Sequence, residues 1–238
     1  MQTQDAPAEI IFKLWPWLEA NKNRLIAAGA GGLVLWAVYY FISTQREQKE
    51  IAAGQAVTAL MVNPVAGSSG GQLSDAYAKL AAKYAGTAAG LRAQLQAAGA
   101  SFSAGRYADA QTQFQKYLEA GAGGPLAATA ALGVAASLES QNKLEPAVAA
   151  YQKVLTVYAG SSCVSSAEFA LGRIAEQQNK LTEALGHYEK VARDPLAGSL
   201  AQEAGMRASE IKSKTAAAAP KPAVTSLPAA APTNAAAK

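Results

Sequence analysis

The sequence has few of the residues from which catalytic and metal sites are usually built. Among its 238 residues there is one cysteine, Cys163, and one histidine, His187. A single cysteine excludes an intrachain disulfide, and together with a single histidine it excludes a zinc site of the usual ligand set. Charged residues make up only 16% of the chain, and the carboxylates are spread singly along it. We therefore expect no enzyme, no catalytic residue, no metal and no cofactor.

Other signs of small-molecule chemistry are missing as well. No Ser, His and Asp in a catalytic order stands out, and the glycines at 29–32 belong to an apolar segment rather than to a phosphate-binding loop. His187 adjoins Tyr188, an aromatic expected to pack, so we expect the histidine on the solvent side of its helix. Cys163 follows two serines and is expected to serve as a small apolar residue near a helix start. We expect no small-molecule substrate.

A basic face is also absent. The formal net charge is +4, and the surplus lies mainly near the C-terminus, at Lys214, Lys221 and Lys238. Without a basic face interleaved with aromatics, we expect no nucleic-acid partner. Aromatic residues are only 7% of the chain, and alanine supplies much of its 50% hydrophobic content. Because alanine favours helix and permits close helix packing, composition predicts an all-α fold.

One long segment has no charge at all. The 21 residues from 25 to 45, between Arg24 and Arg46, carry none. A helix of that length spans about 31 Å, close to the hydrocarbon thickness of a bilayer. Tryptophans at 15 and 17 and aromatics at 36, 39 and 40 suit the two water–lipid interfaces. A buried core helix is one alternative, but the sharp charged flanks and the presence of a single such segment argue against it. A cleaved signal peptide is another, but the segment is long and no small-residue cleavage site closes it. We predict a short lead over 1–24 and a single uncleaved transmembrane helix over 25–45.

Charge at the two flanks of this helix sets its expected orientation. The lead carries Lys13, Lys22 and Arg24, whereas the far flank carries Arg46 and Lys49. Three positive charges against two place the N-terminus in the cytoplasm, by a small margin. The rest of the chain would then lie outside the membrane, in the periplasm if the cell is a Gram-negative bacterium.

Small residues gather inside the predicted span. Ala28 and Gly32 form a small-x-x-x-small pair, with Gly29 and Gly31 beside them. Such a patch lets another helix approach closely, so we regard these four residues as a candidate transmembrane contact. The alternative is that glycine and alanine are simply common in membrane helices.

A fixed period of 37 residues runs through the remainder of the chain. Four lysines stand 37 residues apart, each preceded two positions earlier by an aromatic, and three units open with a glycine or asparagine followed five residues later by an alanine. The lysines are Lys79, Lys116, Lys153 and Lys190, the aromatics are Tyr77, Phe114, Tyr151 and Tyr188, and the openings with their alanines are Gly105 and Ala110, Asn142 and Ala147, and Asn179 and Ala184. A period of this size indicates stacked supersecondary units that bury their apolar faces against one another.

Each full unit is expected to be two helices joined at the glycine or asparagine, because these residues tolerate the left-handed conformation that ends a helix. The alanine should lie where the paired helices touch, the aromatic should fill the space between units, and the lysine should be solvated. We predict a repeat domain over 46–214 of about three to four helix pairs. It would begin with a helix over 46–62 ended at Asn63-Pro64, a loop over 67–71 and a helix over 72–84, and it would close with a capping helix over about 200–212. Residues 215–238 contain four prolines and no aromatics, so we predict a disordered, solvated tail, with a tether to the cell wall as the alternative.

This pattern resembles the tetratricopeptide repeat. The small residue ending a first helix, the second-helix alanine and aromatic, and Leu171-Gly172 twelve residues before Ala184 carry the resemblance. The family's early tryptophan is replaced by Gln94, Ala131 and Glu168, and the period is 37 rather than 34. The resemblance implies a concave groove lined by the first helices and suited to an amphipathic helix or an extended apolar segment. Its register gives the candidate partner-binding residues Arg92, Leu95, Phe102, Glu139, Phe169, Arg173 and Glu176, together with Leu132, which we expect in the core instead.

The whole layout resembles the bacterial ancillary Sec-translocon subunit family over residues 12 to about 212. A lead reading WPWLEANKNRLI, one anchor, QREQKE and then a degenerate tetratricopeptide body carry this resemblance. It implies an inner-membrane protein whose periplasmic repeats contact the Sec translocon, periplasmic chaperones or exported chains. Two other functions remain open, a cytosol-facing targeting receptor of reversed topology and an envelope or division scaffold without a role in export.

Overall fold

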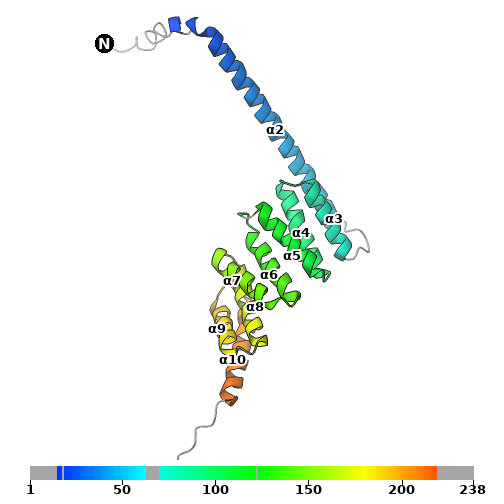
Figure 1. The fold of residues 1–238 in the computed structure, drawn as a ribbon, viewed down its shortest axis with the longest axis vertical. Coiled ribbons are helices and arrows are strands. Elements are labelled where there is room, and N and C mark those ends of the chain that lie inside the picture. Colours follow the sequence, from blue (N-terminus) through cyan, green and yellow to red (C-terminus); the bar gives the residue numbers. More distant parts are fainter. Residues whose placement is uncertain (1–14, 18, 63–69, 122, 219–238) are drawn as a thin grey trace, which may run out of the picture. The chain divides into compact units, whose positions relative to one another are not determined.

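The computed structural model describes residues 15–17, 19–62, 70–121 and 123–218, and every regular element in these ranges is a helix (Figure 1). The predicted all-α solenoid is confirmed. The helices form four pairs and a final helix: α2 (Lys22–Val62), α3 (Gly70–Lys83), α4 (Ala88–Ser103), α5 (Tyr107–Gly121), α6 (Ala127–Ser140), α7 (Leu144–Val157), α8 (Cys163–Gln177), α9 (Leu181–Arg193) and α10 (Ser199–Ala218).

Helix α2 is a single element of 41 residues that joins the predicted membrane span to the repeats. Its first half extends away from α3, α4 and α5 in Figure 1, and its apolar side chains are exposed, with Leu35 73% and Tyr39 72% exposed. Its second half contacts α3 and α4, where Ala53 and Val57 are buried. Among the described helices, α2 alone is long and apolar enough to cross a membrane, and none of its apolar stretch is buried inside the protein.

The helices fall into two units, described here one at a time: residues 1–124 and residues 125–238. In the first unit, α4 packs against both α3 and α5, and α2 packs against α3 and α4. In the second, each helix from α6 to α10 packs against the next one in the chain. The first helices of successive pairs also touch, α6 with α8 and α8 with α10, and they therefore form a continuous row. This is the stacking of a repeat solenoid.

The columns of the 37-residue period have the predicted roles. Tyr77, Phe114, Tyr151 and Tyr188 are all 7% exposed or less, and the three second-helix alanines are fully buried. The four lysines are exposed. Gly105, Asn142 and Asn179 have φ values of +75°, +59° and +58°, so each ends its helix in the left-handed conformation. The repeat pattern in the sequence therefore translates directly into burial and turn geometry.

Two predicted boundaries need correction. Helix α3 starts at Gly70, so Gly70 and Gly71 belong to a helix rather than to the predicted loop; the rest of that loop and the stop at Asn63-Pro64 lie outside the described residues. Helix α10 continues to Ala218 and so takes in the first four residues of the predicted tail. The reason is local, because four alanines follow Thr215 and the first proline comes only at position 220. The remaining tail, 219–238, also lies outside the described residues.

Candidate protein-binding groove

Three of the predicted groove residues come together in the second unit. Arg173 on α8 reaches Glu139 on α6 with both Nη2 and Nε, which lie 2.6 and 3.1 Å from the Oε1 atom. Glu176, one turn further along α8, lies 3.9 Å from Arg207 Nη1 on α10. These four side chains and Gln177 line an open cavity of about 370 Å³ on the row of first helices. The site alternates acid and base, which suits charged and polar groups of a protein partner rather than a wholly apolar segment.

Buried tyrosines hold both glutamates of this groove in place. Tyr151 Oη donates to Glu139 Oε2 at 2.7 Å, and Tyr188 Oη donates to Glu176 Oε2 at 2.9 Å. Burial, reinforced by the hydrogen bond to the nearby carboxylate, raises the pKa of both tyrosines well above the usual value of 10.0. The hydroxyls therefore remain donors throughout the physiological pH range. Both pairs join a first helix to its second helix.

These tyrosine–glutamate bonds were missed from the sequence, although it carries a signal for them. In two successive units a glutamate stands twelve residues before the aromatic, Glu139 before Tyr151 and Glu176 before Tyr188. The preceding unit has Phe102 and Phe114 at these positions and makes no such bond. From this unit to the next two, the earlier position changes from phenylalanine to glutamate while the later position changes from phenylalanine to tyrosine. Such a paired change would have predicted a polar contact between the two positions.

The predicted groove residues of the first unit lie on α4. Arg92 is exposed, whereas Leu95 and Phe102 are half-buried. The Phe102 ring packs against the Tyr107 ring on α5 in a T-shaped arrangement, with 5.2 Å between ring centroids. In the second unit, Phe169 packs at 5.3 Å against Tyr188, which belongs to a buried cluster. Both phenylalanines therefore contribute to the packing between a first and a second helix.

The predicted transmembrane contact lies on the open half of α2. Ala28, Gly29, Gly31 and Gly32 are all exposed. A Cβ atom added at any of the three glycines would meet no other atom within 4 Å. Nothing in the described part of the chain covers this patch.

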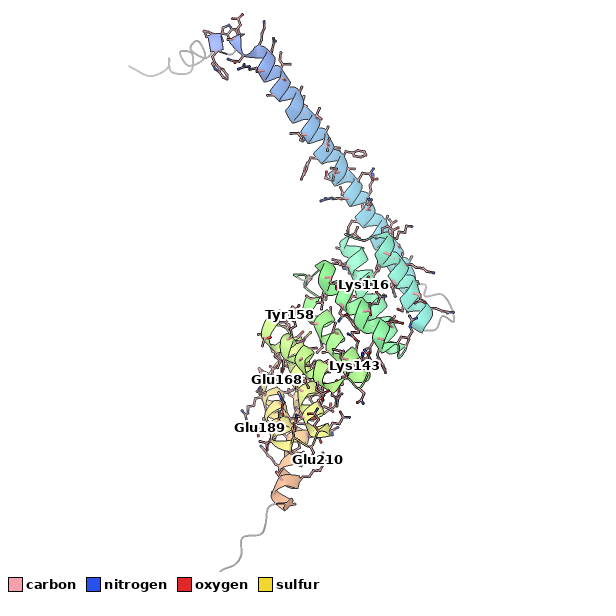
Figure 2. All side chains as sticks on the ribbon, in the orientation of Figure 1. Lys116, Lys143, Tyr158, Glu168, Glu189 and Glu210 are labelled. Atoms are coloured by element: carbon pink, nitrogen blue, oxygen red, sulfur yellow. The ribbon has the colours of Figure 1, made fainter. Side chains whose placement is uncertain are left out.

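A second polar cluster, between α8 and α9, was not predicted. Glu168 is the one charged residue that is buried in the described parts of the chain, and it is labelled in Figure 2. Its Oε2 atom lies 2.5 Å from His187 Nδ1, and its Oε1 atom lies 3.1 Å from Lys190 Nζ. The expectation of a solvent-side His187 is therefore wrong, because 18% of this side chain is exposed and it is paired. Lys190 is exposed as predicted, but it also holds this carboxylate.

The electrostatics of this cluster favour the charged carboxylate. Burial alone would raise the pKa of Glu168, but hydrogen bonds and charges from His187 and Lys190 outweigh it, and the pKa is lowered. Within the described ranges, no three His, Cys, Asp or Glu side chains are grouped so that they could hold a metal ion. The cluster links α8 to α9 through the bonds of Glu168 to His187 and Lys190.

Comparison with known proteins identifies the repeats. A family model described as a tetratricopeptide repeat-like domain matches residues 15–149, more than half of the chain. The chain belongs to this family. Domains with tetratricopeptide-like repeats typically bind other proteins and form scaffolds rather than catalyse reactions. The match begins at Trp15, ahead of the apolar segment, so the end of the lead, the apolar helix and the first repeats of this tetratricopeptide-like protein form one matched stretch.

Solved structures of low sequence identity are also similar. One is a T3SS complex from Aeromonas hydrophila, with 16% identity, a TM-score of 0.47, and coverage of 67% of this chain and 98% of that chain. Another contains the nearly identical TPR-like repeats of a putative kinesin light chain from Podosopora anserina, with 15% identity, a TM-score of 0.47, and coverage of 69% and 95%. No protein in a search of curated sequences matches this chain. The assignment to the family rests on the family model.

Proposed function

We propose that this tetratricopeptide-like protein is a membrane-anchored adaptor that binds other proteins on the periplasmic side of a bacterial inner membrane. The observation that carries the proposal is the continuity of α2. Its apolar first half is uncovered, and its second half is packed into the first repeat without a break between Lys22 and Val62. Exposing this many apolar side chains to water is unfavourable, whereas a bilayer solvates them.

The continuity of α2 also argues for an anchor that stays attached. A cleavage after the apolar stretch would cut a regular helix whose second half contributes Ala53 and Val57 to the core. The matched family domain includes the apolar stretch as well. We therefore assign 25–45 as the transmembrane helix, 1–24 as a cytoplasmic lead, and the following repeats as the binding domain.

Protein export is the process to which we assign the adaptor. The lead and anchor resemble those of the ancillary Sec-translocon subunits, which makes the Sec translocon, periplasmic chaperones and exported polypeptides the proposed partners. The groove on α6, α8 and α10 supplies a surface of suitable chemistry, because it alternates two arginines with two glutamates held by tyrosines. The anchor would keep the protein at the membrane, where exported chains emerge.

Topology is the experiment that tests this proposal. Single cysteines at Gln4 and at Gln152, an exposed position on α7, are introduced in the Cys163→Ser background and labelled with a membrane-impermeant maleimide on intact spheroplasts. Labelling at position 152 alone is expected. Labelling at position 4 alone would instead place the repeats in the cytosol and favour a targeting receptor. If the repeats are periplasmic but no export partner is found, the envelope or division scaffold is the remaining function.

A further inference from the structure

The first helix pair lacks a neighbour that the helices α4, α8 and α10 have. Helices α4, α8 and α10 each pack against the second helix of the preceding pair, which is α3, α7 and α9 respectively. For α2 no preceding helix packs in this way within the described residues, because the chain upstream is the open apolar half of α2 itself. Among the described residues, nothing therefore covers one face of the α2–α3 pair.

This uncovered face is an apolar groove. Ala56, Ala59 and Leu60 of α2 and Ala76 and Leu80 of α3 line an open cavity of about 480 Å³. Leu60 and Leu80 also pack against the buried cluster of Val57, Tyr77, Ala81, Ala93 and Ala97, so the walls of the groove are held by the core. Small alanines on both sides let a helix approach closely, as the alanines within the solenoid do.

The rim of the groove is positively charged. Lys79 and Lys83 of α3 complete its lining, and no acidic residue does. Neither lysine forms a salt bridge with any residue that the structure describes, and Lys83 lies over the ring of Tyr84, 5.2 Å from its centroid. A groove with an apolar floor and two unpaired cations on its rim is complementary to an apolar stripe flanked by carboxylates.

We propose that this α2–α3 groove binds an acidic amphipathic helix of another protein, which completes the solenoid beside α2, where no other described helix takes the preceding position. None of its residues belongs to the groove on α6, α8 and α10. The inference rests on the proposed adaptor function in one respect, that the protein binds a second protein partner. Continuity with the stack supports a helical occupant, since at α4, α8 and α10 the comparable position is filled by a helix.

Two other occupants fit the face less well. The bilayer is too far away, because Ala56 lies 11 residues beyond the end of the proposed span at Gln45, a distance of about 16 Å along the helix. A second copy of this chain paired by a two-fold axis would bring Lys79 and Lys83 against the same two lysines of its partner. Like charges at a desolvated interface oppose association.

The test uses the full chain in lipid nanodiscs and two synthetic peptides of about 18 residues. Both peptides carry the same leucine and alanine stripe at helical spacing, flanked in one by glutamates and in the other by lysines. Binding is measured by fluorescence anisotropy for the wild type, for Lys79→Glu with Lys83→Glu, and for Ala59→Arg. The matched control is Lys116→Glu with Lys153→Glu, two exposed lysines of the same repeat column that lie outside this groove.

The glutamate peptide is expected to bind the wild type at least about tenfold more tightly than the lysine peptide. The Lys79 and Lys83 double variant should reverse this preference, Ala59→Arg should abolish binding of both peptides, and the control should behave as the wild type does. All changed residues are exposed, and an unchanged melting temperature shows that the variants fold. Equal binding of the two peptides, or self-association in sedimentation that Ala59→Arg abolishes, would overturn the proposal. The proposed adaptor function would survive either of those results, because its topology experiment does not involve this groove.

Discussion

At the scale of single residues, one place in the repeat is occupied by two different polar pairs. Gln94 donates to Gln113 between α4 and α5, and 74 residues later, two periods on, Glu168 pairs with His187 between α8 and α9. Lys116 and Lys190 occupy a further shared column, but only Lys190 binds the carboxylate. The protein thus joins a first helix to a second helix with an uncharged pair in one unit and an ionic cluster in the other.

Replacing Glu168 with Gln should destabilise the protein near neutral pH. The lowered pKa of Glu168 means that its carboxylate contributes stability above its unfolded pKa, near 4.5, and that this contribution is lost as the pH falls through the lower folded value. We expect Glu168→Gln to lower the free energy of unfolding by about 1–3 kcal/mol at pH 7, and we expect the difference from the wild type to shrink below about pH 4. Urea denaturation at several pH values measures both effects.

The matched variant for this experiment comes from the chain itself. Glu168→Gln combined with His187→Gln copies the Gln94–Gln113 pair into the second unit. This double variant should recover part of the lost stability and should depend less on pH than the wild type. A double variant that is destabilised by the sum of the two single changes would show that the two places are not equivalent.

Two glycines of α4 should respond in opposite directions to the same substitution. A Cβ atom at Gly90 would lie 2.2 Å from the Tyr84 carbonyl oxygen, whereas one at Gly99 would meet nothing within 4 Å. We expect Gly90→Ala to cost about 1–3 kcal/mol through this clash and Gly99→Ala to stabilise by about 0.5–1 kcal/mol through its backbone effect in a helix. Thermal melts of both variants test the pair, and a stabilised Gly90→Ala protein would contradict the packing of this turn.

At the scale of elements, α2 is attached to the repeats through the N-terminus of α4. The Glu50 carboxylate accepts hydrogen bonds from the Ala88 and Ala89 N–H groups at 3.0 and 2.9 Å, and Thr87 Oγ1 accepts one from the Gly90 N–H. Three otherwise unpaired N–H groups of the helix are thereby satisfied, and a negative charge sits at the positive end of its dipole. The cap links the element that carries the apolar span to the first repeat.

Removing this cap should loosen the joint. Glu50→Ala is expected to cost about 1–2 kcal/mol and to speed amide hydrogen exchange at the start of α4. Glu47→Ala, an exposed change one turn earlier on α2, is the control and should leave exchange unaltered. Exchange measured by mass spectrometry separates the two, and equal protection in both variants would show that Glu50 does not hold the joint.

The elements were mostly predictable because their signals are local. The glycine and asparagine openings, the buried aromatics and the second-helix alanines each follow from a residue type at a fixed spacing. The start of α3 and the extension of α10 were not predicted, because glycine at a helix start and alanine past the expected end fit more than one structure. The Glu50 cap was also beyond prediction, since it joins residues 38 and 39 positions apart and depends on how the helices pack.

At the scale of the whole molecule, the candidate groove was predicted only in part. The repeat register placed Glu139, Arg173 and Glu176 on one surface, and the structure brings them around one cavity. The repeat register did not reveal Arg207 as the fourth charged residue of this cavity, because α10 has no partner helix and so no place in the repeat register. The register also did not predict that Phe169 packs against Tyr188, because this contact depends on how neighbouring helices pack.

The central claim is that the groove on α6, α8 and α10 binds proteins. A photocrosslinking benzoylphenylalanine is placed at Gln177, an exposed residue of the groove, or at Lys153, an exposed residue on α7, in the full chain in native membranes. The account predicts discrete crosslinked protein adducts on irradiation from position 177 and few from position 153. Equal yields from both positions, or no adduct from position 177, would contradict it.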